Sequence, residues 1–253
     1  MDNKYLLSSL ENTLRLIDIM AAEQEIGITE LSSRMNLGKS TIHRILNTLL
    51  KYDYVKQNEA TGRYSLGFKI VNIANDILSK YDIITVTRPP IEALVDSLDE
   101  NAVLFAYANR QVSIIEVYSC HHKRVYYYTG QIYPAYACGA GRAFISHFPP
   151  EQYEKFVSEI SYDLITPFTV NSEASFRERI EKGRKLGYYI CNQEIDEGVI
   201  SFAAPIFSGH GTVDAVLSVY GAASEMTAKR QQITEKLLIT ASECTELAKK
   251  HLL

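Results

Sequence analysis

The sequence predicts an α+β protein with a winged helix-turn-helix at its N-terminus, then a linker helix, then a larger domain of mixed strands and helices. Three observations lead to this prediction. Two helical patterns are separated by a tight turn within residues 29–50, and a strand–turn–strand pattern follows within 54–66. After Pro89-Pro90, strand and helix patterns alternate to the end of the chain. We therefore expect the first domain at 1–67, the linker helix at 68–88 and the second domain at 89–253.

The first domain is predicted to begin with a helix over 5–22 and a short second helix from Thr29 to Met35. The tight turn Asn36-Leu37-Gly38 leads into a third helix over 39–50. Apolar residues of this helix recur at helical spacing and predict a buried stripe, which consists of Ile42, Ile45, Leu46, Leu49 and Leu50. The opposite face carries side chains that can bond phosphates or base edges in a major groove, namely Ser40, His43, Arg44, Asn47 and Lys51.

Helix-turn-helix spacing alone is also compatible with two packed core helices, but two further features favour DNA binding. Residues 54–66 alternate around a turn that contains Gly62, which predicts a β-hairpin, or wing. Residues 34–56 carry several basic side chains against one acid, Asp53, in a chain of net charge −4. Acids near the N-terminus weigh mildly against this, because the domain as a whole is not strongly basic. The predicted contacts to duplex DNA are Lys39, Ser40, Thr41, His43, Arg44, Asn47, Lys56 and Arg63.

Composition indicates a globular protein long enough for two ordinary domains, with 253 residues of which 46% are hydrophobic and 22% charged. The chain has no basic-plus-apolar signal segment and no apolar run of about 18 residues, so we expect a cytoplasmic protein without a membrane partner. The four cysteines are far apart and show no CxxC spacing, so we expect neither a metal site, nor a cofactor, nor a disulfide framework. These cysteines are Cys120, Cys138, Cys191 and Cys244.

Helically spaced apolar residues from Phe68 to about Lys80 predict a connecting helix that packs on a partner copy, and Pro89-Pro90 is expected to break the chain. The second domain is then predicted to alternate strands and helices. Its strands are expected at 103–108, 112–118, 125–129, 188–191, 199–207 and 215–220, and its helices at 141–147, 150–160, 175–186 and 227–252. The turn Gly209-His210-Gly211 is expected to join the last two strands as an antiparallel hairpin.

Several motifs occur in a fixed order along nearly the whole chain: 38–46, 64–67, 134–143, Gly187-Tyr188 leading to Glu194, 197–199 and 203–206. Together they resemble the IclR family of bacterial transcriptional regulators. The resemblance implies a winged helix-turn-helix, a linker helix and a GAF-like effector-binding domain, assembled as homodimers that often pair into tetramers. The sequence departs from the family pattern at Arg142, where Lys is usual, at Tyr136, where His is common, and at Ser224-Glu225, where a Gly-Pro pair is usual.

Segment 138–142 places small residues just before a predicted helix, where free N–H groups favour an anion such as a carboxylate effector. A plain Gly-rich loop with a cap is the structural alternative. The resemblance implies effector contacts from Gly139, Ala140, Cys191, Ser201, Ser218 and Tyr220, with Val125, Tyr133 and Val199 as apolar walls. Several relatives have an acid at the position of Cys191 and a small hydroxyl residue at that of Tyr220, so this chain favours a less hydrophilic, aromatic or longer ligand. We interpret 126–128 as sheet surface and dimer contact.

Two other functions stay open. Cys138 at a helix start resembles a nucleophile, but the sequence places no obvious His or Asp partner beside it, so we do not expect an enzyme. Cys138 and Cys191 would form a thiol redox switch if they meet in the pocket. The pair His121-His122 is not expected to bind a metal, because adjacent side chains on a strand point to opposite faces. The predicted function is an effector-responsive DNA-binding regulator, a repressor rather than an activator, with a pseudo-palindromic operator.

Overall fold

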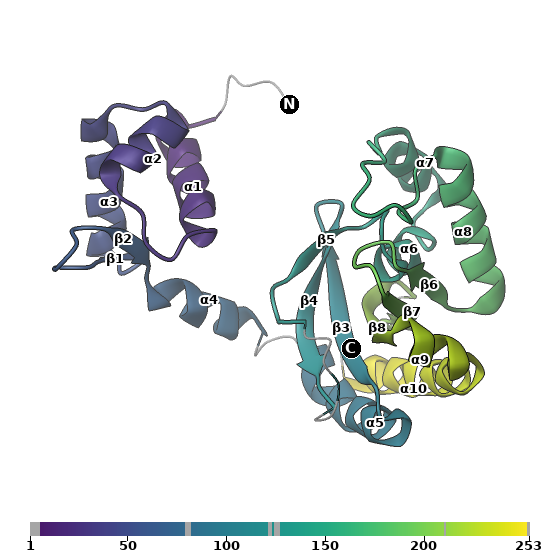
Figure 1. The fold of residues 1–253 in the computed structure, drawn as a ribbon. Coiled ribbons are helices and arrows are strands. Elements are labelled where there is room, and N and C mark those ends of the chain that lie inside the picture. The colour runs from purple at the N-terminus through teal and green to yellow at the C-terminus, as the bar shows by residue number, and fades with distance from the viewer. Residues whose placement is uncertain (1–5, 79–81, 121–122, 124–126, 210, 252–253) are drawn as a thin grey trace. The chain divides into compact units, whose positions relative to one another are not determined.

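The computed structural model describes residues 6–78, 82–120, 123, 127–209 and 211–251 (Figure 1). The chain divides into two compact units, one within Met1–Lys80 and one within Tyr81–Leu253. The first contains α1 (Ser8–Ala21), α2 (Ile28–Met35), α3 (Lys39–Lys51), β1 (Val55–Gln57), β2 (Tyr64–Leu66) and α4 (Phe68–Leu78). The second contains α5 (Asp82–Leu98), β3 (Asn101–Ala108), β4 (Gln111–Tyr118), β5 (Ile132–Pro134), α6 (Gly139–Ile145), α7 (Pro150–Ser158), α8 (Glu173–Leu186), β6 (Tyr189–Asn192), β7 (Val199–Phe207), β8 (Val213–Ala222), α9 (Ala223–Ala228) and α10 (Arg230–His251).

The first unit is the predicted winged helix-turn-helix. Asn36 ends α2 in the left-handed conformation, at φ 53°, and the Ser32 hydroxyl donates to the carbonyl of Leu37 at 2.6 Å, which fixes the turn before α3. Strands β1 and β2 pair antiparallel as the wing. One apolar core holds the helices and the wing together, formed by Leu16, Met20, Ile26, Leu31, Met35, Ile42, Leu46, Leu49, Val55 and Tyr64.

The second unit is built on a six-stranded antiparallel sheet with the strand order β5-β4-β3-β8-β7-β6. Helices α5 and α10 cover one face and α6 covers the other, and α8 packs against α6 and the edge strand β6 (Figure 1). Residues alternate between the two faces along each strand. Cys191 therefore points to the α6 side and its neighbour Ile190 to the opposite side. The predicted hairpin of β7 and β8 is confirmed.

The expected break at Pro89-Pro90 is wrong, because both prolines lie inside α5. A proline within a helix costs about 3 kcal/mol through its missing N–H and its clash with the preceding turn. A continuous apolar stripe outweighs that cost, because each buried aliphatic side chain contributes about 1.5–3 kcal/mol. The stripe runs through the prolines as Ile83, Ile84, Ile91, Leu94, Val95 and Leu98, all buried. The two compact units divide between residues 80 and 81.

Two other elements also differ from expectation. Residues 127–129 of the predicted strand at 125–129 form no strand, and residues 125 and 126 lie outside the described part. The neighbour of β4 is instead β5, which begins after a turn at Gly130 with φ +91°. The predicted closing helix is two helices, α9 and α10.

Candidate functional site

The outer face of α3 presents every helix residue predicted to contact DNA. Ile42, Leu46 and Leu49 are buried on its inner face, which turns the opposite face to solvent. The exposed residues are Lys39, Ser40, Thr41, His43, Arg44 and Asn47. The Asn47 amide nitrogen and the His43 ring nitrogen Nδ1 are hydrogen-bonded at 3.2 Å, so each side chain orients the other. Among the described residues, the Arg44 guanidinium forms no ion pair, so its charge is available to a phosphate or a base.

The two basic residues of the wing differ in their surroundings. Lys56 is exposed, with its ammonium 5.7 Å from the ring centre of Phe68. The Arg63 guanidinium donates to the Glu25 carbonyl at 2.9 Å and pairs with Glu30 at 3.3 Å. Arg63 therefore ties the wing to the segment before α3, and its charge is partly neutralised within the protein.

In the second unit, the start of α6 presses closely on its neighbours. A Cβ on Gly141 would lie 2.0 Å from the carbonyl oxygen of Ala135, so glycine is needed there. The Cys138 thiol caps the helix and accepts a hydrogen bond from the Gly141 N–H at 3.3 Å. The Gly141 N–H, on which the expected carboxylate site depends, therefore already has a partner within the protein.

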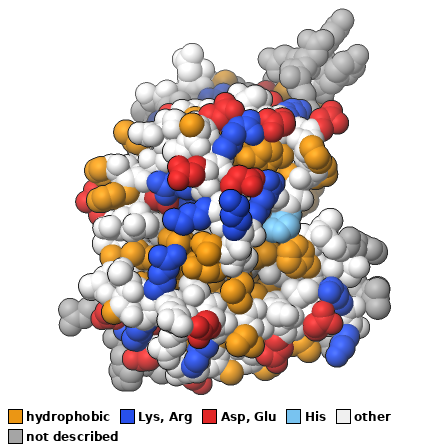
Figure 2. All heavy atoms as spheres, turned by 90° about the vertical axis from the view of Figure 1, so that its right-hand side faces the viewer, with side chains coloured by type: hydrophobic (Ala, Val, Ile, Leu, Met, Phe, Trp, Pro, Cys, Tyr) orange, Lys and Arg blue, Asp and Glu red, His pale blue; other side chains and the backbone are white. Residues whose placement is uncertain are grey.

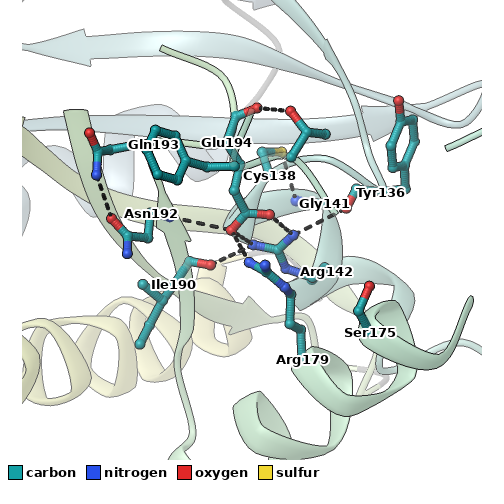
Figure 3. Close-up of polar contacts among 12 residues, drawn as sticks. Tyr136, Cys138, Gly141, Arg142, Ser175, Arg179, Ile190, Asn192, Gln193 and Glu194 are labelled. Atoms are coloured by element: carbon teal, nitrogen blue, oxygen red, sulfur yellow. Dashed lines mark hydrogen bonds and ion pairs between the residues drawn. The ribbon is translucent and has the colours of Figure 1, made fainter. Parts of the chain in front are cut away.

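Behind this helix start lies a buried ion pair (Figure 3). Arg142 is 1% exposed and Glu194 is 0% exposed, and they form two parallel bonds of 2.8 and 2.9 Å. Arg142 also donates to the carbonyls of Tyr136 and Ile190, and Arg179 reaches Glu194 from α8 at 2.5 Å. Arg142 therefore holds the turn between β6 and β7 and does not line the cavity described next.

A small cavity of about 30 Å³ lies between α6 and the sheet and brings together most of the predicted effector residues. These are Ala140, Cys191, Ser201, Ser218 and Tyr220, with Tyr133 and Val199 as predicted walls. Gly139 is outside the lining, because its α-carbon packs on β6, where a Cβ would lie 3.0 Å from the Tyr189 carbonyl. Val125 lies outside the described residues. Tyr136 is likewise absent from the lining; its hydroxyl donates to the carbonyl of Asp163 at 2.6 Å.

Five lining residues were not anticipated: Val103, Phe105, Tyr127, Ile195 and Asp196. Tyr127 was interpreted as sheet surface, and its half-buried ring instead packs on the α6-side core. Asp196 lies between Glu194 and residues 197–199, two of the motifs that carry the resemblance to the IclR family. Its place between them is the sequence feature that could have indicated a lining residue. The alternation of β3 could have indicated Val103 and Phe105, since both point to one face.

The two cavity thiols are poorly suited to nucleophilic or redox chemistry. Burial raises the pKa of the Cys138 thiol to about 12 and that of Cys191 to about 11. The reactive thiolate is therefore scarce at neutral pH. No histidine is among the residues that line the cavity. Both observations weigh against the cysteine-enzyme and thiol-switch alternatives.

A larger groove of about 470 Å³ lies on the opposite face of β6 and β7, between α8 and α10. Its floor includes Ile190 and Phe202, and its rim includes Arg179, Lys182 and Arg230. Figure 2 shows this side of the molecule, where Lys and Arg side chains gather around hydrophobic ones. The groove contains none of the predicted effector residues, so we take the smaller cavity as the candidate effector site.

Within the part of the chain that the structure describes, no group of three His, Cys, Asp or Glu side chains is placed to hold a metal ion. No described helix is both long and apolar enough to cross a membrane.

Two family models match the chain. The model of the C-terminal domain of the bacterial transcriptional regulator IclR matches residues 75–246, and that of the IclR helix-turn-helix domain matches residues 9–59. The chain is 26% identical to the regulator KdgR of Escherichia coli (strain K12), over 93% of this chain and 90% of KdgR. It is also 26% identical to the transcriptional repressor IclR of that organism, over 96% and 90%.

Solved structures share the fold. An IclR transcriptional regulator from Alicyclobacillus acidocaldarius aligns with a TM-score of 0.82 at 21% identity, over 96% of this chain and 100% of that one. An IclR homolog from Microbacterium hydrocarbonoxydans, complexed with 4-hydroxybenzoate, aligns with a TM-score of 0.79 at 19% identity, over 94% and 99%.

Proposed function

Because the chain belongs to the IclR family of bacterial transcriptional regulators, we propose that it is a repressor whose operator binding responds to a small effector. It combines a helix-turn-helix DNA-binding domain with an effector-binding C-terminal domain. As a regulator of genes it acts where the chromosome lies, in the cytoplasm. The observation that carries the proposal is the exposed face of α3, on which Arg44 forms no ion pair among the described residues.

We assign the reading of DNA to α3 and the wing. Lys39, Ser40 and Thr41 lie in the first turn of α3, where they suit phosphates. His43, Arg44 and Asn47 lie further along the same exposed face, where they suit base edges. Lys56 is the wing residue we assign to phosphate. Arg63 is the weaker choice, because it is held by Glu30 and the Glu25 carbonyl.

A homodimer is supported by apolar side chains that the first unit leaves in water. On α1, Leu10 and Leu14 are each 55% exposed, and on α4, Phe68 is 75% and Val71 49% exposed. Such stripes mark contact surfaces. A two-fold dimer would present two copies of α3 to a pseudo-palindromic operator. Two dimers can pair further through other surfaces.

We propose that the effector binds in the cavity beneath α6. Its lining is apolar and aromatic with a few polar tips, Ser201 and Ser218 among them, as is typical of ligand sites. The relative complexed with 4-hydroxybenzoate supports a small organic-acid or aromatic effector for this fold. Binding changes operator affinity only if the effector prefers one arrangement of the protein over another.

The test is selection of binding sequences from a random duplex library, followed by affinity measurement on the selected site by fluorescence anisotropy. Arg44→Ala should weaken binding about 5- to 150-fold, the value of one good base contact. Arg34→Ala is the matched control, because Arg34 is an exposed arginine already held by Glu23 and Glu30. Equal affinities for wild type and Arg44→Ala, or no selected sequence, would refute the assignment.

A further inference from the structure

One side chain that lines the candidate effector cavity, Tyr127, makes contacts like those of a bound ligand. The ring of Tyr127 lies 4.4 Å from that of Tyr220, tilted by 33°, and 6.0 Å from that of Tyr133 in an edge-on contact. Its hydroxyl donates a hydrogen bond to the carboxylate of Asp196 at 2.8 Å. Tyr127 therefore has the contacts expected of a bound aromatic ligand: a stacked ring, an edge contact and one directed polar bond.

With Tyr127 in place, the remaining space cannot hold an organic ligand. The cavity leaves about 30 Å³, far below the roughly 300–1,000 Å³ of ordinary ligand pockets. A ligand must therefore displace a side chain. Tyr127 lies outside the helices and strands, whereas Phe105, Ser218 and Tyr220 belong to the central strands of the sheet. Moving Tyr127 disturbs no strand pairing, so this aromatic side chain can leave.

A residue that lines the cavity also has a polar atom without a partner. The Tyr133 residue is 8% exposed, and its hydroxyl is shut off from water without a hydrogen-bond partner among the described residues. Buried hydroxyls are normally hydrogen-bonded, and an orphan indicates an absent group. A ligand that offers an acceptor atom at this end of the cavity would satisfy it.

The charge of the lining is negative. Asp196 is the charged side chain among the lining residues, and no Lys, Arg or His lines the cavity. The nearby cation Arg142 is fully engaged with Glu194. The ligand group that faces Asp196 should therefore be a hydrogen-bond donor. The aromatic walls formed by Phe105, Tyr133 and Tyr220 favour a ligand with a flat ring.

We propose that the effector is a small phenol that takes the place of the Tyr127 side chain, with its ring stacked on Tyr220 and its hydroxyl donated to Asp196. A second polar substituent accepts the hydrogen bond of Tyr133. The proposal rests on the proposed function in one respect, that this cavity is the effector site. Tyr127 then acts as an internal competitor, and its departure is the structural change that accompanies binding.

The test is isothermal titration of the full chain with 4-methylphenol, which is the tyrosine side chain as a free molecule. Toluene lacks the hydroxyl, benzoate carries an acid and benzylamine a cation on a similar ring. We expect 4-methylphenol to bind the wild type most tightly, by about tenfold over toluene, the value of one hydrogen bond to a carboxylate.

Two variants distinguish the contacts of the bound ligand from those of the competing Tyr127 side chain. Tyr127→Phe should tighten 4-methylphenol binding about two- to tenfold, because the competitor loses its bond to Asp196 while the ligand keeps it. In Asp196→Ala both lose that bond, so the preference for 4-methylphenol over toluene should disappear. Circular dichroism checks that both variants fold.

Several outcomes would overturn the proposal: no binding by any of the four compounds, tighter binding of benzylamine or benzoate, or unchanged or weaker binding to Tyr127→Phe. Operator binding is measured separately, without any ligand. A failed phenol titration with intact operator binding refutes the ligand class alone. If the titrations give the expected result but the protein binds no operator, the regulator assignment is refuted instead.

Discussion

Replacement of Glu194 by leucine should destabilise the second unit strongly. Arg142 would keep its charge, 1% exposed, with its two carboxylate bonds removed and Arg179 still beside it. Removing one partner of a buried ion pair costs about 3–5 kcal/mol, because the remaining charge is left uncompensated. For a unit of this size each kcal/mol lowers Tm by about 2–4 °C. The expected decrease is therefore about 6–20 °C.

The assay is thermal unfolding followed by near-ultraviolet circular dichroism. Tyrosine dominates that signal, because the chain has 17 Tyr and no Trp, and most of the tyrosines lie in the second unit. The double variant Glu194→Leu with Arg142→Met is the matched control. Replacing a whole buried pair by apolar residues is often neutral. The double variant should therefore be more stable than the single one.

Two results would refute this reasoning. A loss of less than about 1 kcal/mol in Glu194→Leu would mean that water compensates the buried charge of Arg142. A double variant less stable than the single one would mean that the pair contributes through shape, by packing the turn between β6 and β7, rather than through charge.

The remaining predictions concern the thiols and the apolar stripe. Iodoacetamide at pH 8, with mass spectrometry as the readout, should modify half-buried Cys120 before Cys138 and Cys191. The raised pKa values of Cys138 and Cys191, about 12 and 11, keep these two thiols protonated. Rapid labelling of Cys138 in the native protein would instead support the thiol-switch alternative. Because the unfolded thiols titrate near 9, the stability that these two groups contribute is complete below that pH and is lost as pH rises through 11 to 12. Val71→Asp should shift the protein toward monomer in analytical ultracentrifugation and weaken operator binding, and an unchanged sedimentation coefficient would exclude α4 from the dimer contact.

The helix-turn-helix could be predicted because its signal is local. The stripe of α3 follows helical periodicity, and Asn36 and Gly38 mark the turn, so no distant contact is needed to define the reading face. The prolines of α5 show the opposite case. Their local signal is a break, and the burial of Ile91 and Leu94 against the rest of the second unit overrides it.

The cavity could be predicted only in part. Ser201, Ser218 and Tyr220 followed from the resemblance, because β7 and β8 fix their positions. The place of Tyr127 depends on where a segment without regular structure folds back, which no periodicity encodes. Arg142, which the sequence singles out only as a departure from the family pattern, has as its partner Glu194, 52 positions away in the sequence.

The exposed stripe of α4 makes the concentration of the protein itself a factor in regulation. If Phe68 and Val71 are covered by a second copy, the species that reads a full operator is formed in proportion to the square of the free chain concentration. In dilute conditions, halving the number of chains would reduce occupancy to about a quarter. The promoter would then respond steeply to synthesis and degradation of the protein, even when the amount of effector is constant.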